Sequence, residues 1–308
     1  MTQWWEKLVY QLIRILARWI GSMSPRRGLR VGRFLGRLLF RWHGRYREIA
    51  VENLRNAYPE KEVKETRDIA ARVFENLGTL LYEICRSTIL SDDDYSRLVT
   101  VDGRHHIEKA HARGKGVLLL TAHFGNWEYL TAMIPHFGHP ISIVYRPLDF
   151  KPLEHFIVDL RTRFGARMIA KKKGFRKVLG SLQRKEMVAL LMDQNVAWRE
   201  GVFAPFFNRP ACTNKGLALL ALKTGAPVVP VFLLREADGY RGVIQPEIPQ
   251  VRTGDKTKDV EINTANYNRA IEDIVRQYPE QWFWVHRRWN TRPYCPWPRR
   301  AKAKAAKK

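Results

Sequence analysis

A histidine and a glutamate five positions apart, His123 and Glu128, are the side chains of this sequence best suited to acid–base chemistry. Along one continuous helix, that spacing would place them about 140° apart, on different faces. Across a corner between a strand and a helix they can meet. A carboxylate that accepts a hydrogen bond from one imidazole nitrogen leaves the other nitrogen free to take a proton from a hydroxyl. The pair therefore indicates a general base, His123, that is oriented by Glu128 and acts on an alcohol.

The neighbouring residues predict such a corner. Residues 117–120 form an apolar run bounded by glycines, which is typical of a strand buried on both faces of a parallel sheet. Asn126 is a suitable N-cap for a helix that begins at Trp127. The pair then lies at the carboxyl end of a strand, where open α/β sheets bind ligands. The backbone N–H groups of Gly125 and Asn126, at the positive end of this helix, are expected to face a developing oxyanion.

Downstream of this corner, strand and helix patterns alternate, which predicts parallel pairing through helical crossovers. The predicted strands are residues 141–145, 188–192 and 227–234, and the predicted helices are 152–164, 175–184, 214–223 and 264–278. Upstream, scaffold helices are expected at 46–58 and 65–89, followed by an acidic loop or helix cap at 91–94. The predicted fold class is α/β, a mostly parallel sheet flanked by helices.

The chain is strongly basic, with 54 Lys and Arg against 30 Asp and Glu and a net charge of +24 over 308 residues. Its surface must attract something anionic, and nucleic acid, anionic lipid and an acidic carrier protein all qualify. The cysteines, Cys85, Cys212 and Cys295, lack metal or disulfide spacing, which favours a reducing, cytoplasmic setting. No metal is expected, because no second histidine or cysteine stands at ligand spacing from His123.

The N-terminal region predicts two basic amphipathic helices. In residues 4–20, an apolar stripe that includes Trp5, Leu12 and Trp19 is interrupted by cations. Those charges argue against a spanning helix of about 20 apolar residues and against a cleavable signal peptide. They favour a helix in the membrane interface, where cations meet anionic headgroups, and packing against the core is the alternative. Residues 29–42 repeat the pattern, with an arginine at positions 30, 33, 37 and 41.

These patterns suggest a division of the chain into three parts. Residues 1–45 are expected to form membrane-associating helices, and residues 46–298 one α/β domain, since no internal linker rich in Gly, Pro or Ser interrupts them. The low-complexity, basic residues 299–308 are expected to form a disordered tail.

Seven motifs, in order along the chain, resemble the lysophospholipid-acyltransferase superfamily, whose signature is His-x-x-x-x-Asp/Glu. More narrowly, they resemble its bacterial branch of late acyltransferases of lipid A biosynthesis. The motifs lie at residues 52–54, 123–128, 145–149, 193–194, 203–207, 225–230 and 281–288. The resemblance implies transfer of a fatty acyl chain from acyl carrier protein, with no further cofactor, to a hydroxyl of a lipid A precursor. It also implies the cytoplasmic face of the bacterial inner membrane, although members often have a spanning N-terminal segment, from which residues 4–20 depart.

Two arginines and one aspartate are further candidates for substrate binding. Arg146 directly follows a predicted strand, and Arg161 lies on the next predicted helix. A guanidinium binds phosphate bidentately, which suits a phosphorylated glycolipid or phosphopantetheine. By the resemblance, Arg161 and Asp193 are implicated in activity or acceptor binding, and Asp193 also follows an apolar run at a predicted strand end. For each arginine, a surface or interstrand ion pair is the alternative.

The sequence holds no Gly-x-Ser-x-Gly elbow, and the lone Cys212 is more typical of an inert core residue. Direct attack by the acceptor is therefore favoured over an acyl-enzyme. Phe203, Phe206 and Phe207 either line an acyl groove or pack in the core. The basic residues 286–288, which lie among tryptophans, fit either a lipid headgroup site or a buried latch.

Two other functions compete with this hypothesis. The first is the same chemistry with a lysophospholipid or another glycolipid as acceptor. For the thioester donor, coenzyme A fits as well as acyl carrier protein. The other is a nucleic-acid-binding α/β protein, which only the pI of about 10.3 suggests. Nucleic acid is not expected as a partner, because that function leaves His123 and Glu128 without a role.

Overall fold

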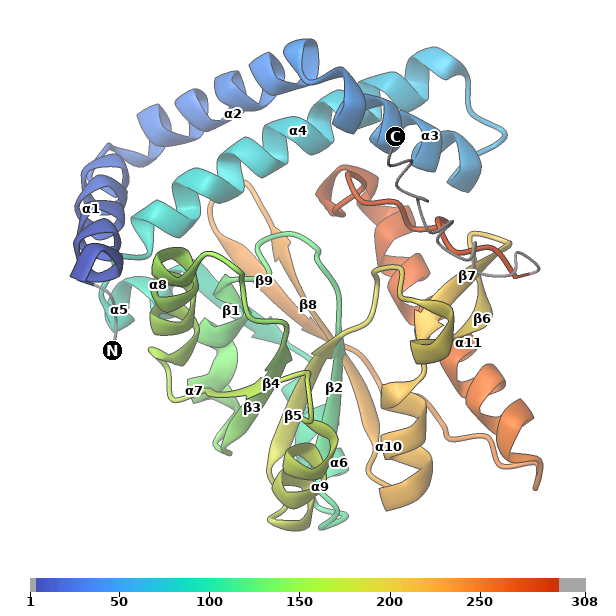
Figure 1. Ribbon diagram of the computed structural model, residues 1–308. Helices are drawn as coiled ribbons and strands as arrows, with labels where there is room; N and C mark the ends of the chain where they lie inside the picture. The colour runs from blue at the N-terminus through green and yellow to red at the C-terminus, as the bar shows by residue number, and fades with distance from the viewer. Residues whose placement is uncertain (1–3, 294–308) are drawn as a thin grey trace, which may run out of the picture.

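The computed structural model describes residues 4–293, and within them one seven-stranded sheet is flanked by helices (Figure 1). The strand order is β1-β9-β8-β2-β5-β3-β4. All neighbouring strands are parallel except β8 and β9. The strands are β1 (Val99–Asp102), β2 (Val117–Thr121), β3 (Ile141–Tyr145), β4 (Arg167–Ala170), β5 (Met187–Leu191), β8 (Val228–Arg235) and β9 (Tyr240–Ile244). The predicted α/β class with a mostly parallel sheet is confirmed.

The helices form an N-terminal group and a set that surrounds the sheet. The first group is α1 (Trp4–Gly21), α2 (Pro25–Trp42), α3 (Gly44–Ala57) and α4 (Val63–Arg86). The others are α5 (Asp92–Leu98), α6 (Arg104–His111), α7 (Ile134–Phe137), α8 (Lys151–Thr162), α9 (Phe175–Gln183), α10 (Gly216–Thr224) and α11 (Lys256–Gln277), with short 3₁₀ turns η1 (Tyr129–Met133), η2 (Trp198–Glu200) and η3 (Pro279–Gln281). In Figure 1, α2 and α4 run side by side above the sheet.

The central strand β2 is buried on both faces, as its unbroken apolar run predicted. Leu118 and Leu120 belong to a core cluster that includes side chains from α4, α10 and α11. Val117 and Leu119 belong to a second cluster, built with α6 and α7. Because neither face meets water, the strand can be apolar over residues 117–120, and polar side chains begin at its last residue, Thr121.

Most predicted elements lie within a few residues of the observed ones, and the larger differences have local causes. α11 begins earlier than predicted because the Asp255 side chain accepts hydrogen bonds from the first-turn N–H groups of Thr257 and Lys258. The acidic run is a helix cap, in which Ser91 and Asp94 bond each other at the start of α5. The sequence analysis missed β1, β4, β9, α6 and the separate antiparallel pair β6 (Gly201–Phe206) and β7 (Arg209–Asn214).

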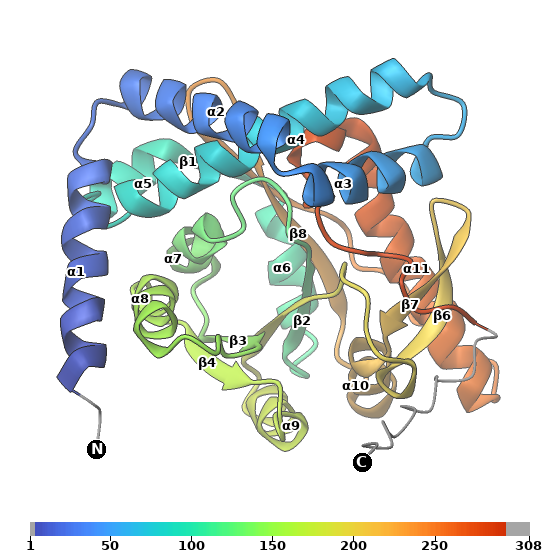
Figure 2. The same cartoon turned by 45° about the horizontal axis from the view of Figure 1, so that its top comes forward.

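Glycines allow α2 to lie directly on α4. A Cβ at Gly32 would stand 2.6 Å from the carbonyl oxygen of Gly78, and one at Gly36 would stand 2.1 Å from that of Phe74. Because glycines occupy the contact, the bulky side chains of α2 remain outside, and Phe34 and Trp42 are 61% and 78% exposed. The helix, which lies along α4 at the outside of the molecule in Figure 2, therefore presents apolar side chains and arginines together on its outer surface.

α1 has one packed face and one exposed face. Ala17 packs with Cys85 of α4 and Phe156 of α8, whereas Ile15 and Trp19 are 63% and 71% exposed. Within residues 4–293, no helix is both long and apolar enough to cross a membrane. The division at residues 45 and 46 stays a prediction, and the predicted tail at 299–308 and Cys295 lie outside the described residues.

Candidate active site

His123 and Asp193 meet at the carboxyl edge of the sheet. β2 and β5 are neighbouring parallel strands, so the residues that follow them reach the same edge. Asp193 accepts hydrogen bonds from His123 Nδ1 at 2.9 Å and from the His123 backbone N–H at 3.0 Å. The indole Nε1–H of Trp282 donates to the same carboxylate at 2.9 Å. The sequence placed Asp193 at a strand end but did not pair it with His123.

This contact determines what His123 can do chemically. Burial alone would raise the pKa of Asp193, but the attraction and hydrogen bonds of His123 outweigh it and hold the pKa well below the usual range. The ionised carboxylate accepts the Nδ1–H, which leaves the lone pair on Nε2. The His123 side chain is 25% exposed, so an acceptor hydroxyl can reach it. Trp127 and Phe283 flank the imidazole, with ring centroids 5.3 and 6.0 Å away.

Glu128 is engaged elsewhere. It accepts hydrogen bonds from Arg161 Nε at 2.8 Å and Nη2 at 2.7 Å, and from Trp127 Nε1 at 3.0 Å. None of the hydrogen bonds between described residues joins Glu128 to His123. The orienting carboxylate that the sequence analysis assigned to Glu128 is therefore supplied by Asp193.

The backbone of the corner explains this difference. The helix predicted to begin at Trp127 is replaced by a turn, and the 3₁₀ turn η1 begins at Tyr129. Asn126 does act as a cap, because its Oδ1 accepts the Tyr129 backbone N–H at 3.1 Å. Because the backbone turns at residues 127 and 128, the Glu128 carboxylate lies against α8 and contacts Arg161 there.

Gly125 is held by a segment from far along the chain. Its N–H donates to the Gln281 carbonyl at 2.9 Å, so this amide is already bonded and does not fit the predicted oxyanion contact. Its φ is +58°, and a Cβ would lie 1.9 Å from the Leu233 carbonyl oxygen, so the position requires glycine. Beside it, the Phe283 N–H donates to the His123 carbonyl at 3.1 Å. An oxyanion contact from the Asn126 backbone stays a prediction.

The two candidate arginines lie in different environments. Arg161 is 22% exposed and its guanidinium forms a two-bonded fork with the Glu128 carboxylate, which is 8% exposed. Arg146 is 80% exposed and lies 3.4 Å from Asp149, itself on the surface. Arg161 is thus a largely buried partner of Glu128, while Arg146 has the surface pairing that was its alternative. A role in substrate binding stays a prediction for both arginines.

An apolar cavity opens beside these residues, between the sheet and the segment from η1 to α7. Arg161 and Trp127 line it together with Thr121, whose Oγ1 is buried without a hydrogen-bond partner among the described residues. The other lining residues are Leu119, Leu130, Thr131, Ile134, Phe137, Ile141, Ile143, Ala189, Leu191 and Val231. The sequence analysis missed this cavity because its residues come from four strands, from η1, α7 and α8, and from the turn at Trp127.

Two of the three aromatic residues considered for an acyl groove belong to the core instead, and for Phe203, which is partly buried, the groove stays a prediction. Phe206 and Phe207 are buried, and their rings lie tilted against those of Trp282 and Trp284, respectively. The groove interpretation of these two residues is therefore wrong, because no open surface is left beside them.

Of the basic residues 286–288, Arg288 forms a buried latch, whereas Arg287 is exposed. Arg288 is completely buried and donates to the Cys212 carbonyl at 3.1 Å and to Thr213 Oγ1 at 2.6 Å. Burial lowers its pKa to about 10. The Asn53 side chain donates to the carbonyls of Trp284 and His286 at 2.8 and 2.6 Å, which ties the segment to α3.

The α/β fold and the paired His123 and Asp193 suit an enzyme that moves a proton, and the family match below defines its class as an acyltransferase. The chain belongs to the bacterial lipid A biosynthesis acyltransferase family, whose model matches residues 4–291. It is 31% identical over 267 residues to a lipid A biosynthesis lauroyltransferase of Escherichia coli K12, covering 86% of this chain and 85% of that protein. It is 28% identical over 292 residues to the lipid A biosynthesis palmitoleoyltransferase of the same organism, covering 94% and 88%. A phosphatidylinositol mannoside acyltransferase of Mycobacterium tuberculosis H37Rv is 26% identical over 220 residues, which cover 70% of this chain and 68% of that protein.

Proposed function

We propose that this acyltransferase moves a fatty acyl chain from acyl carrier protein to a hydroxyl of a lipid A precursor, with His123 as general base. The observation that carries the proposal is the 2.9 Å contact between His123 Nδ1 and Asp193, which leaves Nε2 open to a substrate. The family supports the acceptor class. The net charge of +24 favours an acidic carrier protein as the donor.

In the proposed reaction, Nε2 accepts the proton of the acceptor hydroxyl while the hydroxyl oxygen attacks the thioester carbonyl. The tetrahedral intermediate then releases the thiolate, the carbon–sulfur bond breaks, and the imidazolium returns its proton to the sulfur. Asp193 stabilises the imidazolium between these steps. No enzyme atom is acylated, in keeping with the two cysteines of the described chain, since burial raises the pKa of Cys85 to about 11 and that of Cys212 as well.

We assign the acyl chain to the apolar cavity and a positioning role to the pair Glu128 and Arg161. Arg161 lines the cavity while Glu128 holds its guanidinium fork, so Arg161→Lys keeps the charge but loses one arm of the contact. Activity should fall well below wild type in that variant. Arg146 remains a proposed contact for acceptor phosphates, and its exposure predicts a rise in KM alone for Arg146→Ala.

The donor and the acceptor are tested with the purified full-length protein in detergent. Acyl carrier protein and coenzyme A thioesters are each offered with a lipid A precursor or a lysophospholipid, and mass spectrometry identifies the product. We expect acylation of the lipid A precursor with the carrier-protein donor, and none with His123→Ala. Acylation of the lysophospholipid alone would contradict the proposed acceptor, and turnover with coenzyme A alone would contradict the proposed donor.

We also propose that α1 and α2 hold the protein peripherally on the cytoplasmic face of the bacterial inner membrane. The exposed apolar side chains of both helices stand beside arginines, which suits the interface of an anionic bilayer. Each cation near such a surface contributes about 1 kcal/mol, and salt screens this attraction.

Flotation with vesicles containing anionic lipid tests the membrane contact. We expect Trp19→Glu and Phe34→Glu to weaken binding, and high salt to weaken that of the unaltered protein. Ile262→Glu on α11, where the side chain is 37% exposed, is the matched control and should float normally. Extraction from cell membranes by detergent only, and not by salt or alkaline carbonate, would contradict peripheral attachment.

A further inference from the structure

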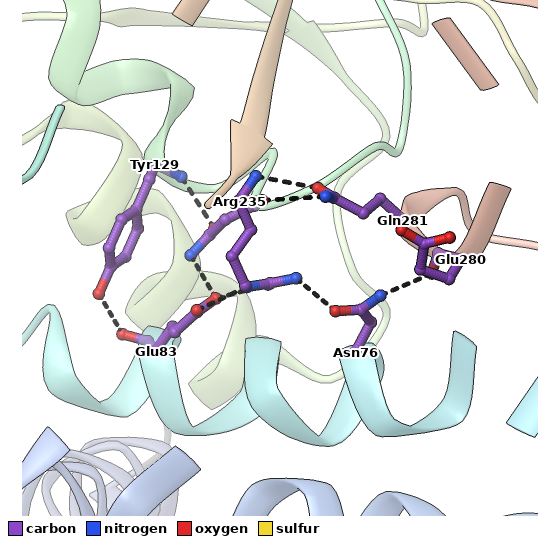
Figure 3. A network of polar contacts seen from close by, with 7 residues as sticks. Asn76, Glu83, Tyr129, Arg235, Glu280 and Gln281 are labelled. Carbon is purple, nitrogen blue, oxygen red and sulfur yellow. Dashed lines mark hydrogen bonds and ion pairs between the residues drawn. The ribbon is translucent and has the colours of Figure 1, made fainter. Parts of the chain in front are cut away.

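A buried ion pair links α4 to the carboxyl end of β8. Glu83 accepts hydrogen bonds from Arg235 Nε and Nη2, both at 2.7 Å. The two side chains are only 4% and 12% exposed. The third guanidinium nitrogen, Nη1, donates to Asn76 Oδ1 at 2.8 Å (Figure 3). Each of the three nitrogens therefore bonds a side chain of α4.

The pair bonds directly to the loop between His123 and Glu128. Asn126, which lies inside this loop and is fully buried, donates its Nδ2–H to Glu83 Oε2 at 2.9 Å. The Tyr129 hydroxyl donates to the backbone carbonyl of Glu83, as Figure 3 shows. Asn126 and Tyr129 also bond each other, so the second half of the loop is fixed to α4 at two points.

The same arginine fixes the other half of the loop through the C-terminal segment. Gln281 exchanges two hydrogen bonds with the Arg235 backbone, at 2.9 and 3.0 Å. The Gln281 carbonyl in turn accepts the Gly125 N–H at 2.9 Å, and the Phe283 N–H donates to the His123 carbonyl at 3.1 Å. Asn76 adds a contact to the Glu280 carbonyl at 2.7 Å.

Stability alone gives little reason to bury this pair, since well-packed apolar side chains of similar size are often as stable or more so. A network of directional hydrogen bonds does give a unique geometry. We propose that Glu83 and Arg235 form a positioning unit for the acid–base loop, which holds His123 and Glu128 at the angle and depth that catalysis requires. The unit touches no reacting atom. Its effect on rate rests on the proposed function, because it acts through the base.

The experiment compares two buried carboxylates that each bind arginine. Glu83→Gln removes the charge of the unit. Glu186→Gln does the same to Glu186, which is 8% exposed and bonds Arg167 and Arg184 at the opposite edge of the sheet. Both variants should lose stability. Only Glu83→Gln should speed hydrogen–deuterium exchange in residues 123–129 and lower kcat, by about 10- to 100-fold, with KM within about twofold of wild type.

Asn126→Ala is the second variant, because it breaks the bond to the loop and leaves Glu83 and Arg235 paired, so it tests the unit even if Glu83→Gln does not fold. We expect the same faster exchange and lower kcat. Wild-type exchange and kcat in folded Glu83→Gln or in Asn126→Ala would overturn the proposal, as would equal effects from Glu186→Gln.

The exchange measurement needs no substrate, so it judges the positioning unit even if the wild-type protein fails to acylate a lipid A precursor. Failure of the proposed function is therefore distinguished from failure of this inference.

Discussion

The two ends of β5 carry buried carboxylates with opposite characters. At the amino end, Glu186 accepts hydrogen bonds from Arg167 and from both arms of Arg184, at 2.7 to 3.1 Å. The hydrogen bonds with Arg184 lead the factors that hold its pKa below the usual range. At the carboxyl end, the pKa of Asp193 is also low, but its main partner is a histidine whose second nitrogen stays open.

The difference shows that polarity alone does not make a site. In the Glu186 cluster, arginines occupy both oxygens of the carboxylate. At the carboxyl edge, by contrast, the hydrogen bonds of the described residues leave His123 Nε2 open, and the buried Thr121 Oγ1 has no partner there. Unused bonding capacity beside a cavity is what distinguishes this edge.

The largest expected effect is the loss of the open nitrogen. His123→Gln should lower kcat/KM by about 10²–10⁴-fold, the usual contribution of general-base catalysis. The fold should persist, because Asp193 keeps the Trp282 indole as a donor. His111→Gln is the control, since His111 sits at the amino edge, where its Nε2 bonds the Lys185 carbonyl and its ring stacks on His139. Near-normal turnover by folded His123→Gln would remove the base from the mechanism.

The next effect concerns the charge behind the base. Asp193→Asn keeps the shape but loses the carboxylate that fixes the His123 tautomer and stabilises the imidazolium, so kcat should fall by at least about tenfold. Because folding lowers the pKa of Asp193, this carboxylate adds to the unfolding free energy of the wild-type protein. Its contribution is fully present above pH about 4 and is lost as the pH falls further. Acid titration of the unfolding free energy should show a weaker loss in the variant. A Glu186→Gln variant should show the weaker acid loss too, with normal kcat.

A moderate effect is expected from His286, whose Nδ1 donates to the Phe283 carbonyl. Burial lowers its pKa to about 4. The folded protein therefore binds fewer protons than the unfolded chain between pH about 6.5 and about 4, so stability should decrease as the pH falls through this window. Urea unfolding at pH 7 and pH 5 should show a smaller decrease in His286→Gln than in wild type. An equal decrease in both would assign the pH dependence to other groups.

The smallest expected effect is a gain in stability. Thr121→Val replaces the unpartnered hydroxyl by a methyl of similar size, which should raise the unfolding free energy by about 1 kcal/mol. Thr264→Val at the other unpartnered buried threonine should do the same. Of these two threonines, Thr121 lines the cavity and Thr264 does not, so turnover should change in Thr121→Val alone. Destabilisation by Thr121→Val would show that the hydroxyl is bonded after all.

The sequence predicted those features of the sheet and of the candidate site that depend on a local pattern of residues. An apolar run with no polar face must be a doubly covered strand, so the position of His123 at a sheet edge followed from residues 117–120. The partner of His123 did not follow, because several carboxylates have the right chemistry and only the order of strands brings Asp193 to it. The contact between Glu83 and Arg235 joins residues 152 positions apart and has no local signature.

One signal was present and went unused. Gly28, Gly32 and Gly36 recur every fourth residue within the second basic helix, which indicates a helix face built for close contact. That spacing predicts α2 packed through its glycines with its bulky side chains outward, as the structure shows.

The segment that completes the site also sets the order of events during synthesis. Trp282 bonds Asp193 across 89 residues of chain, and the neighbouring Gln281 and Phe283 hold the backbone of Gly125 and His123. On the ribosome, α1 and α2 emerge long before this segment, and domains fold as their residues become available. Under the proposed attachment through α1 and α2, a nascent chain can therefore reach the bilayer while its histidine is still unsupported, and membrane attachment then precedes catalytic competence.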